Sequence, residues 1–511
     1  MRKLNSRTVP KFNFGDFFTG SDAPPGPQGG ARLPERGGVR RRAPRLAALL
    51  APALVACALP GGQAPGDGGR LPELPPEPGR PALVVLISVA AMTPDRYRGA
   101  DPAMPSVARL AAAGVAAAEV EPVAPAARAP AHATLVTGRR PAGHRVASDR
   151  LLGERGVRGE GYTHASQLRG PSLWSVAAAA QRPAAALGWP TTTGAAIPLL
   201  LPDVETVRRG SSWLQELADK STPWLHELAG RLGGAAPGTA GPGPARDATL
   251  VGVACEVLAS PAAPALLLLE LGQAGPALAA SGPGAPETAR ALAGADAEIE
   301  RLLGCLARAG RLAASAFIVA GDHGAVDVHS ALAPNALLEE AGLLSRDERD
   351  PALRGWRAIA RSNGGSAFVY ARSEGDALRA RRALEAGAEA SGAFRVVSAE
   401  ELLALGADPE AWFGLEARPG YVFTDGAGAP AEAPTAQRGA GGYLPGRAEM
   451  GPGFVAWGRG VARGVRVPWM RQIDVAPTVA RLLGLVLDAA DGRPLAGALN
   501  LPPDTGPAGQ P

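Results

Sequence analysis

The stretch PALVVLISVAAMTPDRY, from Pro81 to Tyr97, decides the fold of this chain. It is an apolar run that passes directly into a loop, a pattern that indicates a parallel β-strand buried on both faces. In open α/β sheets, ligands bind outside the carboxyl ends of such strands. A catalytic or metal-binding carboxylate is therefore expected where this run ends, but the chain has Val89, Ala90 and Ala91 there.

Further apolar runs follow the first at wide spacing, at residues 264–271, 315–320 and 453–457, and helical patterns separate them. Strands that alternate with helices predict an α/β fold: a doubly wound, mostly parallel sheet with helices on both faces. The body of the chain is therefore predicted to be one large sheet with its helices.

A different pattern interrupts this body. The stretches GGSAFVYAR, FRVVSAEELLAL and YVF, with a charged helical pattern from Ala377, predict a small inserted α+β lobe. The resulting division is a first core segment 81–333, an inserted cap lobe 334–438, a closing core segment 439–501 and a Pro-rich tail 502–511.

Charge is concentrated at the beginning of the chain. The 511 residues carry a net charge of +4, and lysine occurs only at Lys3, Lys11 and Lys220. Residues 1–45 hold ten Lys/Arg and three Asp/Glu, a net charge of +7, which leaves the rest at −3. The body therefore has no basic excess for binding nucleic acid, and we predict no nucleic-acid partner.

The first 57 residues have the pattern of an export signal. Arg40, Arg41, Arg42 and Arg45 precede the apolar run LAALLAPALVA, which ends at Cys57. A basic region, a short apolar region and small residues before a cut are typical of a secretory signal, and the run is too short to span a bilayer.

The residues before Cys57, LVAC, resemble a bacterial lipobox, in which the cysteine is lipidated and becomes the mature N-terminus. We therefore predict an exported lipoprotein anchored to the membrane through Cys57, on the periplasmic or cell-surface side. A Pro/Gly-rich tether at 58–80 would join the anchor to the body. The alternative is an Ala-rich apolar stretch without any role in export.

Two further cysteines lie in helical patterns. Cys255 and Cys305 could form a disulfide in an exported protein, or remain as buried free thiols. They lack Cys-X-X-Cys spacing, so we predict no metal site there. The sequence leaves both alternatives open.

Five blocks resemble the type I phosphodiesterase / nucleotide pyrophosphatase branch of the alkaline phosphatase superfamily, and the resemblance covers most of the chain from Pro81 to about Leu485. The first is the opening strand, which ends in Asp-Gly in the family. The others, in the family's order, are PAARAPAHATLVTGRRPAGH from Pro125, GWPTTTGAA from Gly188, FIVAGDHGAVDVH from Phe317, and GGYLPGRAEMGPGFVAWGRGV with RQIDVAPTVARLLGL in the closing segment. The resemblance implies an alkaline-phosphatase-like fold in which the inserted lobe is a cap that shapes the substrate entrance.

The resemblance also implies a site in which a Thr or Ser nucleophile and two zinc ions transfer a phosphoryl group. Matched to the family's motifs, Arg128 occupies the nucleophile position, and Asp322 and His323 remain as a metal-ligating pair. The other ligand positions hold residues whose side chains bind no metal: Ala90, Gly275, Ala279 and Gly441. We therefore predict no cofactor, or at most one weakly bound zinc at Asp322 and His323.

Arg128 has two interpretations. It is a product of drift after the nucleophile became dispensable, or its guanidinium replaces a lost metal and pairs with Asp322. Because the position precedes a helix, the same guanidinium would also suit an oxyanion. His132 and His144 are interpreted as structural, and a new metal site using Asp327 and His329 is the less favoured interpretation.

Three functions follow from this comparison. The first is a degenerate, non-catalytic member of the family that binds a partner or acts as a scaffold. The second is a metal-dependent hydrolase of phosphodiesters or phosphomonoesters that uses replacement ligands. The third is an oxyanion-binding module centred on Arg128. The sequence identifies neither a protein partner nor a small ligand.

Overall fold

The computed structural model describes residues 71, 78–204, 207, 211–234, 241–346, 353–428 and 430–502. The predicted signal, Cys57, nearly all of the tether and nearly all of the tail lie outside these ranges. Everything below concerns the compact body that begins after Gly68.

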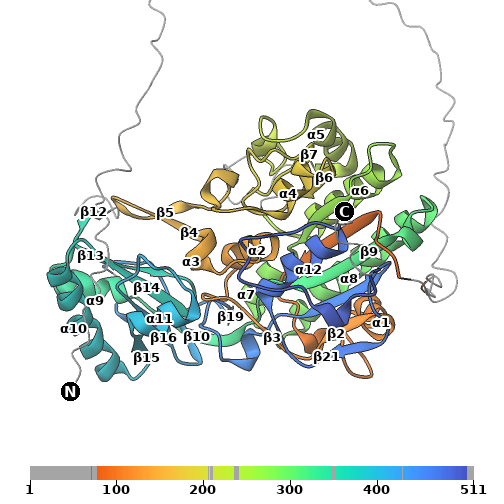
Figure 1. Cartoon of the computed structure of the whole chain (residues 1–511). Helices are drawn as coiled ribbons and strands as arrows, with labels where there is room; N and C mark the ends of the chain where they lie inside the picture. The colour runs from red at the N-terminus through yellow and green to blue at the C-terminus, as the bar shows by residue number, and fades with distance from the viewer. Residues whose placement is uncertain are drawn as a thin grey trace, which may run out of the picture. The chain divides into compact units, whose positions relative to one another are not determined.

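An eight-stranded sheet forms the centre of the body (Figure 1). Its strands, from one edge to the other, are β21 (Val465–Val467), β2 (Val115–Ala117), β20 (Phe454–Gly458), β9 (Ser315–Gly321), β1 (Leu83–Val89), β8 (Leu266–Leu271), β6 (Ala184–Leu187) and β7 (Leu199–Leu201). Every neighbouring pair is parallel except those of β20, which runs antiparallel to β9 and to β2. This confirms the predicted α/β class with a mostly parallel sheet.

The opening strand lies in the middle of this sheet, and all seven of its residues are buried. Leu86 pairs with Leu268 of β8 on one side and with Ile318 of β9 on the other. Because neighbouring side chains along a strand point to opposite faces, a strand in this position must be apolar at nearly every residue. That requirement explains the uninterrupted run in the sequence.

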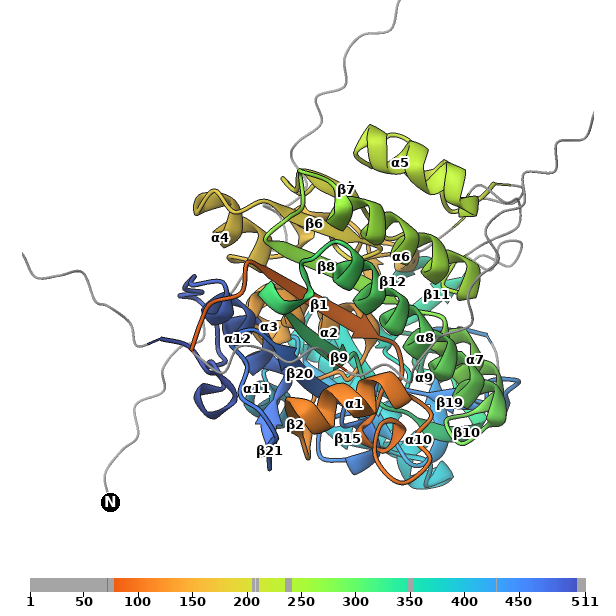
Figure 2. The same ribbon diagram turned by 90° about the vertical axis from the view of Figure 1, so that its right-hand side faces the viewer.

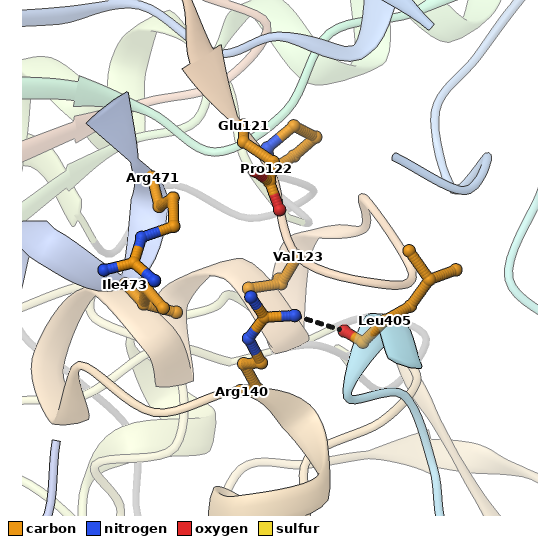
Figure 3. A pocket seen from close by; sticks show the side chains of 7 residues that line it. All are labelled: Glu121, Pro122, Val123, Arg140, Leu405, Arg471 and Ile473. Atoms are coloured by element: carbon orange, nitrogen blue, oxygen red, sulfur yellow. Dashed lines mark hydrogen bonds between the residues drawn. The ribbon is translucent and has the colours of Figure 1, made fainter. Parts of the chain in front are cut away.

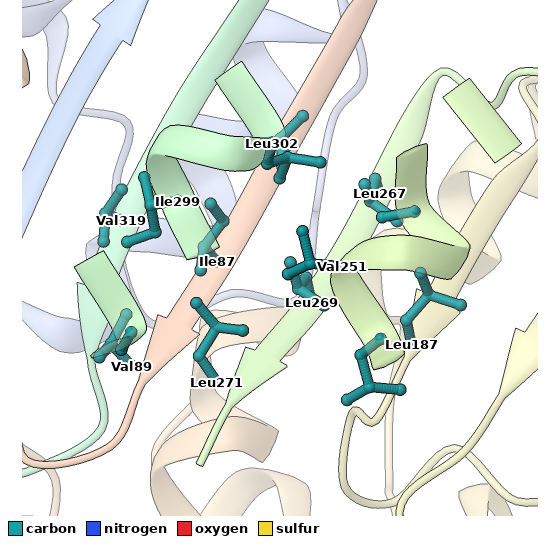
Figure 4. Close-up of a cluster of buried hydrophobic side chains, with 14 of the residues drawn as sticks. Ile87, Val89, Leu187, Val251, Leu267, Leu269, Leu271, Ile299, Leu302 and Val319 are labelled. Atoms are coloured by element: carbon teal, nitrogen blue, oxygen red, sulfur yellow. The ribbon is translucent and has the colours of Figure 1, made fainter. Parts of the chain in front are cut away.

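Helices cover both faces of the sheet. Figure 2 looks onto the face covered by α1, α6 and α8; here Ile87 and Val89 contact a core to which Val251 of α6 and Ile299 of α8 contribute (Figure 4). On the opposite face, Leu86 belongs to a second core that includes side chains of α2, α4 and α12. The helices of the central body are α1 (Pro105–Ala113), α2 (Arg128–Thr137), α3 (Pro141–His144), α4 (Leu173–Ala179), α5 (Pro223–Ala229), α6 (Pro244–Ala259), α7 (Ala274–Ser281), α8 (Pro286–Arg308) and α12 (Val475–Leu482).

A disulfide joins Cys255 of α6 to Cys305 of α8. Of the two alternatives that the sequence left open, the structure therefore has the bridged form. The bond links two helices that pack side by side over the same face of the sheet (Figure 2). None of the helices in the described ranges is long and apolar enough to cross a membrane.

The segment predicted as a cap lobe contains a second, four-stranded antiparallel sheet in the order β13-β14-β16-β15 (Figure 1). It has its own apolar core. Its elements are β13 (Ala358–Ser362), β14 (Ser366–Ala371), β15 (Phe394–Val397), β16 (Phe413–Ala417), α9 (Pro334–Glu340), α10 (Glu374–Ser391) and α11 (Ala399–Leu405).

Short strands complete the structure between and around the two sheets. β10 pairs with β17, β18 and β19, and the other short strands form three separate pairs. Their bounds are β3 (Val120–Glu121) with β22 (Met470–Arg471), β4 (Arg150–Gly153) with β5 (Gly156–Gly161), β11 (Leu344–Arg346) with β12 (Leu353–Trp356), and β10 (Val326–Leu332), β17 (Gly420–Phe423), β18 (Glu432–Pro434) and β19 (Gly439–Ala440).

Polar contacts attach the lobe to the core. Arg361 of β13 is buried and donates to Asp408 of the lobe at 2.9 Å and to the hydroxyl of Tyr162, which follows β5, at 3.3 Å. Elsewhere Arg140 donates to the carbonyl of Leu405, at the end of α11, at 3.1 Å (Figure 3). The small pocket around this second contact measures about 10 Å³, which is room for about one water molecule.

Candidate functional site

The loops after β1, β9 and β19, together with helix α7 after β8, place predicted ligand positions near one another. A Cβ atom at Gly275 would lie 3.8 Å from the Cβ atom of Ala90. A Cβ atom at Gly441 would lie 2.4 Å from Nδ1 of His323. The ring of His323 therefore occupies the space into which a ligand at position 441 would project.

Asp322 now organises the backbone at the end of β1. Its Oδ1 accepts the N–H of Ala91 at 3.1 Å and that of His323 at 2.7 Å, and the side chain is almost completely buried. Ala91 has a φ of 60°, a conformation that few residues other than glycine adopt. The carboxylate thus stabilises a turn that the alanine alone would disfavour.

His323 is held by the same loop. Its Nδ1 donates to the carbonyl of Gly324 at 2.7 Å, and its Nε2 lies 3.7 Å from Oδ2 of Asp322. Asp322 and His323 supply two potential ligands, whereas a zinc site needs four in all and at least three from protein. Within the described ranges no three His, Cys, Asp or Glu residues are grouped to hold a metal. The residues present do not fit the family's two-metal centre.

The remaining positions that the sequence singled out do not extend this pair. Ala279 lies in α7, and its carbonyl accepts the N–H of Arg438, just before β19. Asp327 and His329 alternate along β10 with exposed side chains, and His329 is bonded to Ser330 at 3.0 Å. Among the described residues, the structure therefore brings no third metal ligand to Asp327 and His329.

Arg128, at the first residue of α2, binds carboxylates other than the predicted one. Its Nε donates to Oε1 of Glu270 at 2.7 Å, and its Nη2 donates to Oδ2 of Asp203 at 2.8 Å. Asp322 instead uses its carboxylate on the loop backbone. The predicted Arg128–Asp322 pair is therefore wrong: the guanidinium binds Asp203, in the loop after β7, and Glu270 of β8.

A second arginine closes the arrangement. Nη2 of Arg246, at the start of α6, donates to Oδ1 of Asp203 at 2.6 Å and to Oε2 of Glu270 at 3.1 Å. Each carboxylate therefore binds one arginine through each of its oxygens, and each arginine bridges both carboxylates. We call Arg128, Asp203, Arg246 and Glu270 the ion cluster.

The ion cluster is buried, apart from Arg128, whose side chain remains 27% exposed. Burial raises the pKa of the Asp203 carboxyl, but the charges of Arg128 and Arg246 outweigh this and hold it below its ordinary value. Burial likewise lowers the pKa of Arg128, and the two carboxylates outweigh it. The pKa values of Arg128 and Asp203 therefore favour their ionised forms, and the ion cluster joins two arginines to two carboxylates.

The two histidines interpreted as structural have internal partners. His132 is buried; its Nδ1 donates to the carbonyl of Arg128 at 2.8 Å, and its ring meets Trp189 edge-on at 5.1 Å. His144 bonds to Thr134 at 3.0 Å, and burial lowers its pKa to about 3. Both geometries agree with packing roles.

Comparison with known proteins agrees with this architecture. A family model described as type I phosphodiesterase / nucleotide pyrophosphatase matches residues 84–442. The chain belongs to this family. Its fold resembles that of human ectonucleotide pyrophosphatase / phosphodiesterase 5, with a TM-score of 0.59 and 16% identity over 82% of this chain and 100% of that one. An inactive form of the murine protein in complex with AMP gives a TM-score of 0.59 and 17% identity over 82% and 99%. No curated protein sequence matches the chain.

Beside Arg128, this family member has a cleft of about 240 Å³. It lies at the carboxyl ends of β6 and β7, the side of the sheet where α/β proteins bind ligands. Its lining residues are Arg128, Ala129, Asp149, Tyr162, Thr163, Pro190, Asp203, Val204 and Pro242. The ion cluster thus forms part of the cleft's wall.

Sequence reasoning missed three of the four members of the ion cluster. Glu270 offered a signal, because it is the one charged residue in the apolar strand LLLLEL and is completely buried there. An ionised carboxylate in such a strand needs a cationic partner. Asp203 and Arg246 offered no such signal. An aspartate in a loop and an arginine in the first turn of a helix are both common at protein surfaces.

We expect Arg128→Ala to lower the free energy of unfolding by about 3 kcal/mol, because it leaves Glu270 and Asp203 with one cation between them. Arg128→Ala combined with Glu270→Gln should recover part of this loss. Urea denaturation of the single and double variants measures both quantities.

Arg381→Ala is the control for this experiment, because Arg381 forms an exposed pair with Glu385 in α10, for which less than about 1 kcal/mol is expected. Two outcomes would contradict a cooperative cluster. One is a loss of stability in Arg128→Ala no larger than that in the control, and the other is strict additivity of the two effects in the double variant.

A second expectation concerns Asp247, beside the ion cluster. Burial raises the pKa of its carboxyl to about 7, and the opposing effect of Arg246 is weaker. From about pH 4 to pH 7 the folded chain then holds a proton here that the unfolded chain has lost. The contribution of this proton to the free energy of unfolding is fully present below about pH 4 and is lost as the pH rises through 7.

Asp247→Asn should remove this dependence. The free energy of unfolding of the parent chain, minus that of the variant, should fall by about 1.4 kcal/mol per pH unit between pH 5 and 6.5. His144, whose low pKa acts in the opposite direction, is present in both chains and cancels. Parallel curves of stability against pH would show that Asp247 is ionised in the folded chain.

Proposed function

We propose that this chain is a non-catalytic member of its family that works by binding. The observation that carries the proposal is the state of Arg128: the nucleophile position holds a guanidinium that two carboxylates fix in place. A guanidinium is permanently protonated and cannot attack phosphorus. The function is then assigned to the surface and the cleft that the fold preserves.

Metal chemistry with replacement ligands has less support. Such a hydrolase needs new donors near Asp322 and His323, and the neighbouring loops present Ala90, Gly275 and Gly441. The Asp322 carboxylate is also committed to two backbone N–H groups. A weakly bound zinc at this pair stays a prediction, which the metal content of the purified chain tests.

The oxyanion-binding alternative also loses support. Nε and Nη2 of Arg128 already donate to Glu270 and Asp203. An external anion would be left with the remaining N–H groups of this guanidinium, beside two carboxylates that repel it.

We expect the purified chain to hydrolyse bis(4-nitrophenyl) phosphate and 4-nitrophenyl phosphate at the background rate, with or without added zinc. Arg128→Thr should be equally inactive, because a hydroxyl alone restores no metal site. Release of 4-nitrophenolate measures both. Zinc-dependent turnover that disappears in Asp322→Asn would overturn the proposal, since this variant keeps an oxygen for the loop backbone and removes the charged ligand.

We propose further that the chain is exported and anchored to a membrane through Cys57. The sequence before Cys57 and the disulfide between Cys255 and Cys305 support export, because disulfides persist mainly in oxidising compartments. Cys57 itself lies outside the described residues.

Expressed with its full leader in a bacterial host, the chain should begin at a lipidated Cys57 and partition into detergent. Cys57→Ser should lose both properties while the disulfide remains. Mass spectrometry of the N-terminus and phase partition measure them. An unmodified Cys57 in a chain recovered from the cytoplasm would refute the anchor.

A further inference from the structure

The cleft beside Arg128 is large enough for a small organic molecule. Its volume of about 240 Å³ exceeds the roughly 150 Å³ of a protein cavity that takes up benzene. Apolar atoms line much of it, from Ala129 of α2, Pro190 after β6, Val204 after β7, and Pro242 before α6. These four residues come from separate segments, so the cleft is a feature of the tertiary fold.

Both features that would attract an anion already bind carboxylates of the chain itself. Arg128 binds Glu270 and Asp203. The start of α2, where backbone N–H groups favour negative charge, is covered by Asp149, whose Oδ1 accepts the N–H of Ala129 at 2.7 Å. Asp149 stands where an anionic ligand of this helix would bind.

Charge at the cleft is therefore negative overall. Among the described residues, the ion cluster is neutral, with two arginines and two carboxylates. Asp149, which lines the cleft, adds one negative charge that no arginine or lysine neutralises in these contacts. An anion brought into the cleft would be repelled by Asp149, whereas a cation would compensate it.

We propose that the cleft binds a small organic cation with an apolar body, such as an aryl-alkyl amine. Its charged group lies near Asp149 and Tyr162, because a carboxylate and an aromatic ring both favour an ammonium group. Its apolar part contacts Pro190, Val204 and Pro242. This deepens the proposed binding role and gives it a class of ligand opposite in charge to a phosphate ester.

The cap lobe takes part in forming this site. Tyr162 lines the cleft, and its hydroxyl accepts a hydrogen bond from Arg361 of the lobe at 3.3 Å. The same arginine is paired with Asp408 at 2.9 Å. The position of Tyr162, and with it one side of the cleft, consequently depends on the lobe.

Calorimetric titration of the purified chain with matched probes tests the proposal. The probes share a phenyl group and a two-carbon arm: phenethylamine as the cation, 2-phenylethanol as the uncharged analogue and 3-phenylpropionate as the anion. The amine should bind at least about 10-fold more tightly than the anion. Asp149→Asn, which keeps an oxygen for Ala129, should weaken the amine about 5-fold and leave the alcohol unchanged.

Asp101→Asn is the matched control, because it removes the same charge from an exposed residue before α1. It should change no affinity. Tighter binding of the anion would overturn the proposal and restore the oxyanion-binding alternative. Absence of binding by all three probes, or an Asp149 variant that behaves like the parent, would also overturn it. The hydrolysis assay is independent: turnover with intact amine binding would refute only the non-catalytic function.

Discussion

The ion cluster is the interaction on which the arrangement of this site depends. It joins four separate segments of the chain: the start of α2, the loop after β7, the start of α6 and the carboxyl end of β8. Each carboxylate oxygen is matched to an arginine, so no member can leave without exposing a charge to a poorly solvated interior. The cluster therefore ties the start of α2 to the sheet, and it holds Arg128 and Asp203 in the wall of the cleft.

The positions that match the family's metal ligands differ from a metal site in more than their side chains. Gly441 lies so close to His323 that a side chain there would require the ring to move. Next to it, a Cβ atom at Gly442 would lie 1.5 Å from the carbonyl oxygen of Asn363 in the lobe. Here the backbone itself fills the space, and the loop can approach the lobe so closely only because it carries no side chains. Restoring a metal site would thus require the loop to be rebuilt, in addition to the lost residues.

The fold could be predicted from the sequence because one segment shows the pattern that a central parallel strand requires. A central parallel strand must be apolar on both faces, and Leu83–Val89 meets this condition without interruption. The lobe was also visible, because its strand and helix patterns break the periodicity of the core. The disulfide could not be predicted, since cysteines in two helices pair only if those helices pack with the right rotation.

The partner of Arg128 could not be predicted for a different reason. The sequence pointed to Asp322 because the two positions share a metal in the family. The choice of partner depends on which carboxylate is free: Asp322 accepts backbone N–H groups of its own loop and of the turn after β1, whereas Glu270 is buried in a strand. Desolvation of Glu270 thus decides the pairing, and only the sheet register and the helix position reveal that two arginines reach it.

A buried ion cluster is seldom more stabilising than well-packed apolar side chains of the same volume, so stability alone does not account for it here. Its location offers a better reason. Arg128 and Asp203 both reach the wall of the cleft, and they remain ionised there because Arg246 and Glu270 lie behind them. An apolar replacement would keep the core and lose the polar wall. Its two arginines and two carboxylates balance in charge, and Asp149 remains, among the described residues that line the cleft, for a ligand to compensate.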